Sequence, residues 1–599
     1  MFRGGWTLEA AESVGAGDGV ADGDVLALLT QLDAKSLVHR RDAGGAPRFH
    51  MLETVRQFAA EKCAHDPETE SAAIRHMLYF AAMADAERLA QASPSSAAWR
   101  SRLASELDNL QRALHVATSS GSLEPAMRLG IVLAKIWELH GTFAPVSALL
   151  LPLLDRTPSP GLQSLRTGLQ VAVADLILQA GDLDGALHLA QAALDAAVRL
   201  GDNRGLADAQ QVIAQRALWT GDFESAGDLY EASRRLCLEL DDVVGAAAAL
   251  RGLGQLAIIR GDLVSAAAQF QESLELARSA RDPHATASAL NGLGATDVAR
   301  DDHMAARAAF EEALAIFRQL RLPGRVSVTL HNLAIVSASS GDSDGAMAFA
   351  RESLSLARTL DDKIGVADTL LLLGNMEVAH DDVHAGLAKQ VESLAIMRAI
   401  GYQRALPVLL LNLSDAEERL DHLDAARGYA QECVALCTEG GIADHLGGAL
   451  SNLSRIAARE GDEAQARRHF SAAVTALRQK EWVGTLLQVF ETRASSPPFA
   501  SQTSLKLRLG GAAAAMREAI GVRRALRDEA RLQLLFDAAG QDLGPAETVR
   551  LLEEGRALTR EEAVAYALEE LSWDDLRGVV AERLATSALA AGASGRSQG

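Results

Sequence analysis

The chain is poor in the residues that build sheets, disulfide frameworks and membrane spans. Of its 599 residues, 4% are aromatic and 14 are proline, which leaves room for long, uninterrupted helices. Four scattered cysteines are too few for a disulfide framework. No run of 18 apolar residues occurs, and the opening MFRGGWTLEAAESV has no apolar stretch of signal-peptide length. We therefore expect an all-α, soluble protein of the bacterial cytoplasm, without membrane contact.

The chain is acidic. It has 79 acidic and 58 basic residues, which gives a formal net charge of −21. A surface of this sign repels phosphate backbones, so nucleic acid is disfavoured as a partner of the whole chain. A chain of 599 residues is also too long for a single core, and several domains or a repeat array are expected.

A 40-residue period runs through the middle of the chain without a slip. Leucines keep this phase in pairs three residues apart, as at Leu250 and Leu253, and small residues do so as well, as at Ala186 and Ala226. Such a period identifies an internal repeat. Its clearest marks are two-residue turns, mostly Gly-Asp, which begin at residues 181, 221, 261, 301, 341, 381, 421 and 461.

The spacing within each unit predicts two helices. Leucines at i and i+3, followed by a small residue at i+4, form one buried face of a first helix. Glycine can end that helix with a positive φ, and aspartate can cap the next helix. The second helix presents a small residue and, four residues later, often an aromatic one, as at Tyr230, Phe270 and Phe310. Two helices of about 16 residues fit the unit.

This order of residues resembles the tetratricopeptide repeat family over about residues 165–485. The usual unit of that family is about 34 residues long. The longer unit is similar to the variant with extended helices found in bacterial regulators and in kinesin-light-chain-like scaffolds. Because a single unit cannot bury both of its faces, neighbouring units must stack. We therefore predict a tetratricopeptide-repeat superhelix of 40-residue units.

A different pattern precedes the repeats, over residues 1–64. We expect a short helix over residues 25–32, strands over 37–40 and 48–51 around a Gly-rich turn, and a helix from residue 53 onward. Helix, hairpin and helix are the order of a winged helix whose wing is the hairpin. Residues 65–164 are expected to be a helical connector to the repeats.

Several stretches of this region carry a second resemblance: FRGGWTLEAAESV, LLTQLDAKSLV, RFHMLETVRQFAAEKC, RHMLYFAAMADAE and ELDNLQRAL. They resemble the segment that follows the nucleotide-binding module in bacterial signal-transduction ATPases of the NB-ARC (STAND) type, which are large transcriptional regulators. The phosphate-binding loop of that family contains a Gly-Lys pair, and this sequence has none. The resemblance therefore implies a start inside a winged helix, no cofactor in this chain, and ATP only with an upstream P-loop module.

The pattern changes again after the repeats, where we expect a linker, further helices and a tail. Residues 486–504 include Ser-Ser-Pro-Pro and are expected to be a linker. Amphipathic helices are expected over 505–572, and a short helix with a disordered tail over 573–599. In the family that the chain resembles, such segments often precede a LuxR-type DNA-binding helix-turn-helix, and none is visible here.

Three patterns that look like catalytic or metal sites fit the repeat better. Residues 341–345 match Gly-x-Ser-x-Gly, but they form one of the equivalent turns and have no strand before them. His380 and His384 straddle a turn, with no third metal ligand evident. Cys433 and Cys437 occupy apolar columns of the repeat, which favours buried thiols. We therefore expect no catalytic residue, no metal site and no enzyme.

Polar residues on the first helices are the candidates for ligand contact, because first helices line the concave groove of tetratricopeptide arrays. An amide side chain has both a donor and an acceptor and can hold the backbone of a peptide. In related scaffolds, asparagine at this place has that role. The alternative, a merely solvated inner face, stays open. The candidates are Gln211, Gln215, Arg251, Gln255, Asn291, His331, Asn332, Asn375, Asn412, Asn452 and Arg455.

Two functions are compatible with these observations. The first is a sensor scaffold of a bacterial regulator that binds a protein or peptide, or a small-molecule inducer, in the concave groove. The second is a DNA-binding regulator that acts through the N-terminal winged helix, supported by Arg40, Arg41 and Arg48 on the expected wing. The sequence does not determine the partner, the signal, the regulated genes or the oligomeric state.

Overall fold

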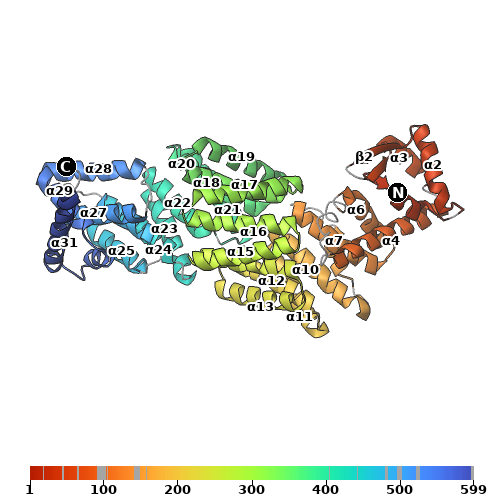
Figure 1. Cartoon of the computed structure of the whole chain (residues 1–599), viewed down its shortest axis with the longest axis horizontal. Helices are drawn as coiled ribbons and strands as arrows, with labels where there is room; N and C mark the ends of the chain where they lie inside the picture. The colour runs from red at the N-terminus through yellow and green to blue at the C-terminus, as the bar shows by residue number, and fades with distance from the viewer. Residues whose placement is uncertain are drawn as a thin grey trace. The chain divides into compact units, whose positions relative to one another are not determined.

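A computed structural model describes residues 1–599 except 18, 44–45, 64–65, 91–102, 104, 141–148, 157, 404, 441–442, 479–482, 496–501, 521–525 and 595–599. The chain forms two compact units. Unit 1 comprises Met1–Leu373 and Ala395–Arg404, and unit 2 comprises Gly374–Leu394 and Ala405–Gly599. Both units are built mainly of helices, as Figure 1 shows.

Unit 1 opens with a small antiparallel sheet. Its central strand is β3 (Ala46–His50), which pairs with β1 (Trp6–Thr7) on one side and with β2 (His39–Ala43) on the other. The β2 and β3 strands form the expected hairpin, but they extend closer to its tip than residues 37–40 and 48–51. The reason is their register, in which Ala43 pairs with Ala46.

Three helices surround this sheet, of which the first was not expected from the sequence. Helices α1 (Leu8–Gly15) and α2 (Asp22–Ala34) precede the hairpin, and α3 (Glu53–Cys63) follows it. The small core between them includes Trp6 and Val38. The helix, hairpin and helix expected from the sequence are therefore present, with β1 as an additional strand.

One of the three arginines expected on the wing is buried and cannot contact DNA. Arg48 is only 9% exposed. Its guanidinium forms an ion pair with Glu106 and donates a hydrogen bond to the backbone oxygen of Gly5 at 3.2 Å. Arg40 and Arg41 remain exposed on β2. The register explains the difference, since Arg48 lies on the central strand, where it is covered by the connector helices.

The segment between this sheet and the repeats is helical. Its core includes Phe80, Leu114 and Trp137, all at most 1% exposed. The described elements are α4 (Pro67–Ala90), α6 (Leu107–Ser119), α7 (Leu123–His140), α9 (Leu151–Leu154) and the 3-10 turn η1 (Pro160–Leu162).

The repeats follow as pairs of helices that keep the 40-residue period. In each pair the first helix precedes the Gly-Asp-type turn and the second follows it. Most of these helices are 17 residues long. In unit 1 and across its boundary they are α10 (Gln163–Gln179), α11 (Leu183–Leu200), α12 (Asn203–Trp219), α13 (Phe223–Glu239), α14 (Val243–Ile259), α15 (Leu263–Ser279), α16 (Pro283–Ala299), α17 (His303–Gln319), α18 (Pro323–Ser339), α19 (Ser343–Thr359), α20 (Lys363–Ala379) and α21 (Val383–Ile400).

The turn between paired helices is built as the Gly-Asp pattern predicts. Gly221 has a φ of 82°, a conformation that is strained for residues with a Cβ. The next residue, Asp222, caps α13 by accepting a hydrogen bond from the backbone N–H of Ser225 at 3.2 Å. Glycine and aspartate thus end one helix and begin the next.

Two turns of unit 2 place aspartate where glycine is expected. Asp381 and Asp421 have φ values of 71° and 67°, in the left-handed region. Each carboxylate accepts a hydrogen bond from an arginine 38 residues later, from Arg419 at 2.6 Å and from Arg459 at 2.7 Å. We infer that these contacts offset part of the strain of a left-handed aspartate.

The small residues of the second helices also make hydrogen bonds. The hydroxyl of Ser233 donates to the backbone oxygen of Ala207 at 2.9 Å, and that of Ser273 donates to Ala247 at 2.8 Å. In both cases the acceptor lies 26 residues earlier, on the first helix of the same repeat. The column is therefore small and polar because it must both fit between helices and bond to the backbone.

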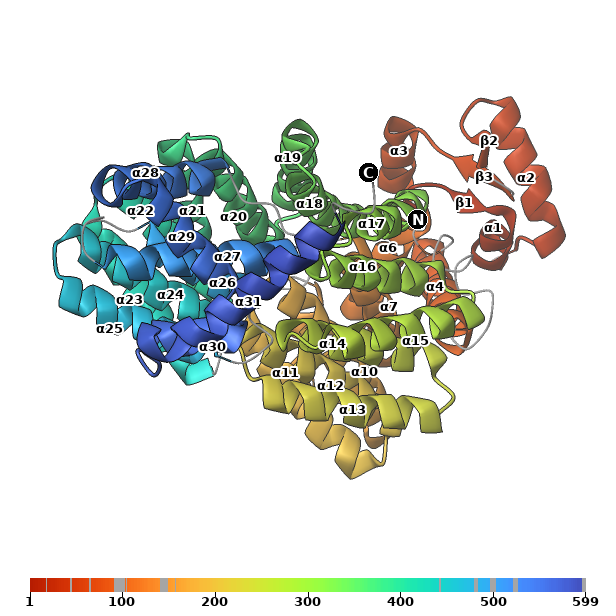
Figure 2. The same cartoon turned by 60° about the vertical axis from the view of Figure 1, so that its left-hand side comes forward.

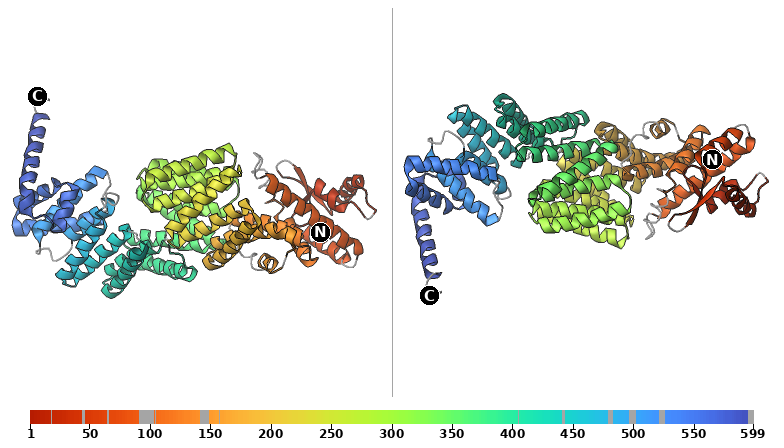
Figure 3. Two further views of the ribbon diagram at one scale, coloured as in Figure 1. Left: turned by 90° about the horizontal axis from the view of Figure 1, so that it is seen from below. Right: turned by 90° about the horizontal axis from the view of Figure 1, so that it is seen from above.

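The first helices of unit 1 close into a ring. In sequence order α10, α12, α14, α16 and α18 each contact the next. Helix α7 contacts α10 at one end of this series and α18 at the other. Figure 2 labels α10, α12, α14, α16 and α18 among the other helices of unit 1, and Figure 3 gives two further views of the same ribbon. The repeats of unit 1 therefore curve until their ends meet.

Unit 2 continues the pairs and ends in further helices. It corrects two boundaries. Helix α26 occupies much of the expected linker at 486–504, because its apolar residues Leu486 and Phe490 are buried. The last helix continues to Ser594, so most of the expected disordered tail is helical. The elements are α22 (Leu406–Arg419), α23 (Leu423–Gly440), α24 (Ala443–Arg459), α25 (Glu463–Ala476), α26 (Val483–Ala494), α27 (Thr503–Ile520), α28 (Leu526–Leu543), α29 (Pro545–Arg556), α30 (Arg560–Ala567) and α31 (Trp573–Ser594).

Candidate functional site

The candidate site comprises the polar side chains in two columns of the ring helices of unit 1, the column of Gln211 and the column of Gln215, which we call the inner face. On α14 these are the half-buried residues Arg251 and Gln255, one helical turn apart. Gln211 and Gln215 occupy the same places on α12, 40 residues earlier. These two columns contain the sequence-predicted residues of unit 1 other than Asn332.

Hydrogen bonds between neighbouring first helices connect part of the inner face. Asn291 Nδ2 on α16 donates to Thr329 Oγ1 on α18 at 2.9 Å. His331 Nδ1 on α18 lies 3.3 Å from Thr369 Oγ1 on α20. Both pairs are separated by 38 residues, so they are the same contact in successive repeats.

The same contact is impossible earlier in the ring. The residues that correspond to Thr329 and Thr369 are alanines on α14 and α16, so Gln211 and Arg251 meet no hydroxyl there. Gln211 instead donates to Ser233 Oγ at 3.0 Å and to the backbone oxygen of Gly245 at 3.1 Å. Its amide is therefore part of the packing between α12, α13 and α14.

Gln215 is also bonded within its repeat. Its Oε1 accepts a hydrogen bond from the hydroxyl of Tyr230 on α13 at 3.0 Å. For Gln255, its equivalent on α14, the counterpart of Tyr230 is Phe270, which has no hydroxyl to donate.

Two amide oxygens of the inner face are buried and have no hydrogen-bond donor among the described residues. Gln255 Oε1 and Asn291 Oδ1 receive no hydrogen bond in the part of the chain that the structure describes. Leaving such an oxygen unsatisfied costs about 1–3 kcal/mol. A donor from a bound molecule or from water would remove that cost, so this stretch of α14 and α16 is the part of the ring best suited to hold N–H groups.

Asp208 on α12 lies one helical turn before Gln211 and was missed by sequence reasoning. Burial raises the pKa of its carboxyl, while the positive charges of Lys135 on α7 and of Arg204 act in the opposite sense. Lys135 is therefore close enough to Asp208 to favour its charged form. The signal that could have found Asp208 is its phase, since it lies one turn before Gln211.

The asparagine column lies to one side of the inner face. Gly252 and Gly292 share the column of Asn332. A Cβ added to these glycines would come within 2.3 Å of Tyr230 and 2.1 Å of Phe270, both on the second helix of the preceding repeat. The column therefore points toward that helix, and Asn332 occupies the place where other repeats have glycine.

The remaining asparagines belong to unit 2. Asn412 is half-buried, and like Asn332 it has no hydrogen-bond partner among the described residues. Asn452 Nδ2 donates to the backbone oxygen of Leu411 at 3.4 Å. Asn375 Oδ1 accepts from Gln390 Nε2 at 2.9 Å. Because Asn332 is in unit 1, the predicted column is divided between the two units.

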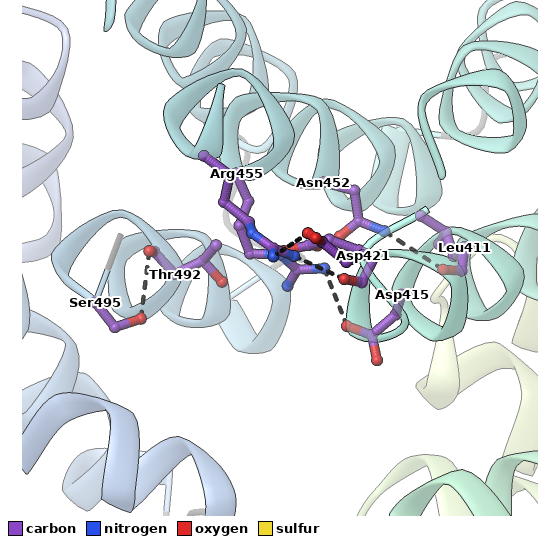
Figure 4. A network of polar contacts seen from close by, with 9 residues as sticks. Leu411, Asp415, Asp421, Asn452, Arg455, Thr492 and Ser495 are labelled. Atoms are coloured by element: carbon purple, nitrogen blue, oxygen red, sulfur yellow. Dashed lines mark hydrogen bonds and ion pairs between the residues drawn. The ribbon is translucent and has the colours of Figure 1, made fainter. Parts of the chain in front are cut away.

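Arg455, the last candidate, is the centre of a polar network in unit 2 (Figure 4). Its guanidinium forms an ion pair with Glu418 and another with Asp415 at 3.0 Å, both on α22. The side chain of Glu418 is 4% exposed. Burial lowers the pKa of Arg455, but the two carboxylates outweigh it and the net shift is upward. Arg455 is thus held as a buried cation that joins α24 to α22.

The patterns that resembled catalytic or metal sites are structural in this fold. Ser343 is the first residue of α19, directly after its cap Asp342, and no strand precedes it. Cys433 and Cys437 are both fully buried, with their sulfur atoms 3.9 Å apart. Within the described ranges, no group of three or more histidine, cysteine or acidic side chains could hold a metal ion.

Comparison with known proteins supports the repeat fold. A family model of the tetratricopeptide repeat matches residues 213–279 and 285–359. Proteins named as HTH-type transcriptional regulators in Mycobacterium bovis and Mycobacterium tuberculosis are each 36% identical to this chain over 136 residues. The match covers 23% of this chain and spans 15% of the length of each relative.

Solved structures with a similar arrangement of helices are distant. A Rap protein complexed with competence and sporulation factor is 13% identical, with a TM-score of 0.47, over 61% of this chain and 99% of that protein. The apo quorum sensor NprR of B. thuringiensis is 12% identical, with a TM-score of 0.41, over 58% and 97%. A STAND protein with a tetratricopeptide repeat sensor from Pyrococcus horikoshii is 14% identical, with a TM-score of 0.37, over 69% and 57%. Such distant likenesses carry no argument about this chain.

One further observation concerns membranes. None of the helices in the described ranges combines the length and the apolar character that crossing a bilayer requires.

Proposed function

We propose that this chain is the sensor scaffold of a bacterial regulator and that it binds an extended peptide or protein segment on the inner face of unit 1. The observation that carries this proposal is the pair of buried, unsatisfied amide oxygens, Gln255 Oε1 and Asn291 Oδ1. The fold buries them without using them, although the equivalent Gln215 is bonded within its repeat.

An extended peptide suits this chemistry. Its backbone presents N–H donors and C=O acceptors at regular intervals, and side-chain amides can pair with both. The donors would satisfy Gln255 and Asn291, and peptide carbonyls could accept from amide nitrogens of the same face. A small-molecule inducer with several N–H groups is the second possible ligand, and it would use the same oxygens.

The regulatory context rests on two further observations. The relatives that match part of the chain are named as transcriptional regulators. The helix, hairpin and helix before the repeats have the order of the winged helix that follows the nucleotide-binding module in NB-ARC-type ATPases. We infer that the repeats serve as the receiving part of such a regulator in the cytoplasm. We assign no catalytic role and no cofactor to this chain.

Affinity capture tests the proposal. The tagged chain is used to recover partners from a bacterial lysate, and each candidate peptide is then synthesised and titrated by fluorescence anisotropy. We expect Gln255→Ala with Asn291→Ala to weaken binding at least about tenfold, because two hydrogen bonds of about 1 kcal/mol each are lost. The matched control is Met304→Ala, at an 81% exposed position on second helix α17.

Two outcomes would count against the proposal. Equal affinity of the wild type and the double variant would exclude the inner face as the binding surface. Equal loss in Met304→Ala would indicate a general effect on folding and not a local one.

DNA binding through the hairpin remains the alternative, and only Arg40 and Arg41 now support it. A mobility-shift titration separates the two functions, because binding through phosphate contacts must weaken steeply as salt is raised. Salt-dependent binding that is lost in Arg40→Ala with Arg41→Ala would favour this alternative.

A further inference from the structure

A short turn after α21 joins the two ends of the repeats in unit 1. Helix α21 ends at Ile400, and Gly401 reverses the chain with a φ of 70°. The backbone N–H of Tyr402 then donates to the oxygen of Met397 at 2.9 Å, which fixes the turn on the helix end. We call residues Ile400–Gln403 the Tyr402 turn.

The Tyr402 turn packs against the end of α12, about 180 residues earlier in the chain. Tyr402 is 2% exposed, and its ring meets that of Trp219 edge-on, with centroids 6.2 Å apart. The backbone N–H of Gln403 donates to the oxygen of Trp219 at 3.3 Å. The hydroxyl of Tyr402 donates to Asp368 Oδ2 on α20 at 3.2 Å.

A second contact lies beside the first. Ile400 packs on the turn between α10 and α11, where a Cβ added to Gly181 would lie 3.3 Å from Ile400 Cδ1. Gly181 also has a φ of 91°, so both the turn and the close approach of Ile400 favour glycine there. The Tyr402 turn therefore contacts the first two repeats of the array, at the turn between α10 and α11 and at the end of α12.

These contacts close the ring where it is weakest. Neighbouring repeats share whole helix faces. Within the described residues, the ends of the series meet through the smaller contact of α7 with α18 and through the Tyr402 turn. Across the closure, the turn contributes the backbone hydrogen bond from Gln403 to Trp219 and the side chains of Tyr402 and Ile400, whereas the hydroxyl of Tyr402 bonds to α20, the helix paired with α21. A closure of this size opens more readily than any interface within the array, because few contacts must be broken at once.

The position of the turn in the chain matters as well. Residues Gly374–Leu394 belong to unit 2, whereas Ala395–Arg404 belong to unit 1, so α21 begins in one unit and ends in the other. After the turn the chain returns to unit 2 at Ala405. The chain therefore crosses between the units three times: within α20 after Leu373, within α21 after Leu394, and directly after the Tyr402 turn.

We propose that the Tyr402 turn is a clasp that holds the ring of unit 1 closed and must release before a macromolecular ligand reaches the inner face. This inference rests on the proposed function, since it assigns the regulation of that same face. Release opens the ring between its two ends and leaves the stacking of the repeats intact. Because α21 is shared, a change in unit 2 that pulls on α21 also loosens the clasp.

Cysteine accessibility tests the clasp without any ligand. The reporter is Gln255→Cys on the inner face, in a Cys63→Ser background, because Cys63 is exposed while the other three native cysteines are buried. Two reagents are compared, small N-ethylmaleimide and a bulky polyethylene-glycol maleimide. The bulky reagent reports ring opening, and the small one reports general exposure of the reporter.

We expect Tyr402→Ala to raise the labelling rate of the bulky reagent by at least about tenfold, with a smaller effect on the small reagent. Tyr402→Phe keeps the ring contact with Trp219 and loses only the hydrogen bond to Asp368, so its rate should be intermediate. Phe310→Ala is the matched control, since Phe310 is 1% exposed and lies in the core around α17, away from the clasp.

The result that would overturn the clasp is an unchanged bulky-reagent rate in Tyr402→Ala, while hydrogen exchange shows that residues 395–403 have lost protection. An equal increase in Phe310→Ala would overturn it too, because opening would then reflect lost stability anywhere in the ring. Circular dichroism verifies that each variant is folded. A failure here leaves the peptide proposal standing, and a failure of Gln255 and Asn291 to affect ligand binding leaves the clasp standing.

Discussion

Replacement of Arg455 by methionine should destabilise unit 2 by about 3 kcal/mol. Removing one partner of a buried ion pair typically costs about 3–5 kcal/mol, because the other charge stays buried. Glu418, with 4% of its side chain exposed, is that charge. Arg459 Nη1 remains 3.6 Å from Glu418, which places the cost at the lower end of the range. Asp415, at 32% exposure, adds less than about 1 kcal/mol.

The measurement is urea unfolding followed by hydrogen exchange in peptides of α22 and α24, because repeat arrays do not always unfold in one step. Replacing both partners, Arg455→Met with Glu418→Leu, should recover most of the loss, since an apolar pair leaves no buried charge. Arg455→Lys keeps the charge but loses the planar fork, and it should fall between. A double variant that is less stable than Arg455→Met would refute this reasoning.

Three further predictions follow from single contacts. Gly292→Ala should destabilise unit 1 by about 1–3 kcal/mol, because its Cβ would lie 2.1 Å from the ring of Phe270. The loss should appear in calorimetry as a lower melting temperature, and an unchanged melting temperature would contradict this packing. His76 is 1% exposed, and its burial is the main cause that lowers its pKa from 6.5 to about 4. The N-terminal segment should therefore lose stability as pH falls from 6.5 to 4. In His76→Phe, the free energy of unfolding should no longer depend on pH in this range. The hydrogen bond from Arg583 lowers the pKa of Glu562 to about 2, so the contact of α30 with α31 should persist above pH 4.5 and be lost toward pH 2, whereas Glu562→Gln should make hydrogen exchange there independent of acid.

The repeats could be predicted from the sequence because they depend on local rules. The phase of Leu250 and Leu253, the turn at Gly221 and the cap at Asp222 each act within one or two helices, and the structure confirms helix pairs at the predicted period. The burial of Cys433 and Cys437 follows from the same rule, since a repeat places equivalent positions in equivalent surroundings.

The candidate site could be predicted only in part. Periodicity places Arg251 and Gln255 on first helices, but it does not tell which side chains the neighbouring helix satisfies. Whether a side chain is satisfied depends on one residue of the neighbouring helix. Thr329 accepts a hydrogen bond from Asn291, whereas the corresponding residue for Gln211 is an alanine. The rotation of each first helix about its axis turns the column of Asn332 toward the second helix of the preceding repeat. The sequence does not show this rotation; the contacts of Gly252 and Gly292 in the same column do.

The sequence by itself determined the helical repeat, its period and the chemistry of its turns, because these result from contacts between residues fewer than about 40 positions apart. Only the tertiary structure decided that the repeats of unit 1 curve until α18 meets α7, that Tyr402 reaches Trp219, and that Arg48 is buried against Glu106. The physical reason is accumulation. Each repeat adds a small rotation to the last, and the meeting of the two ends depends on the sum of those rotations, which no single repeat encodes.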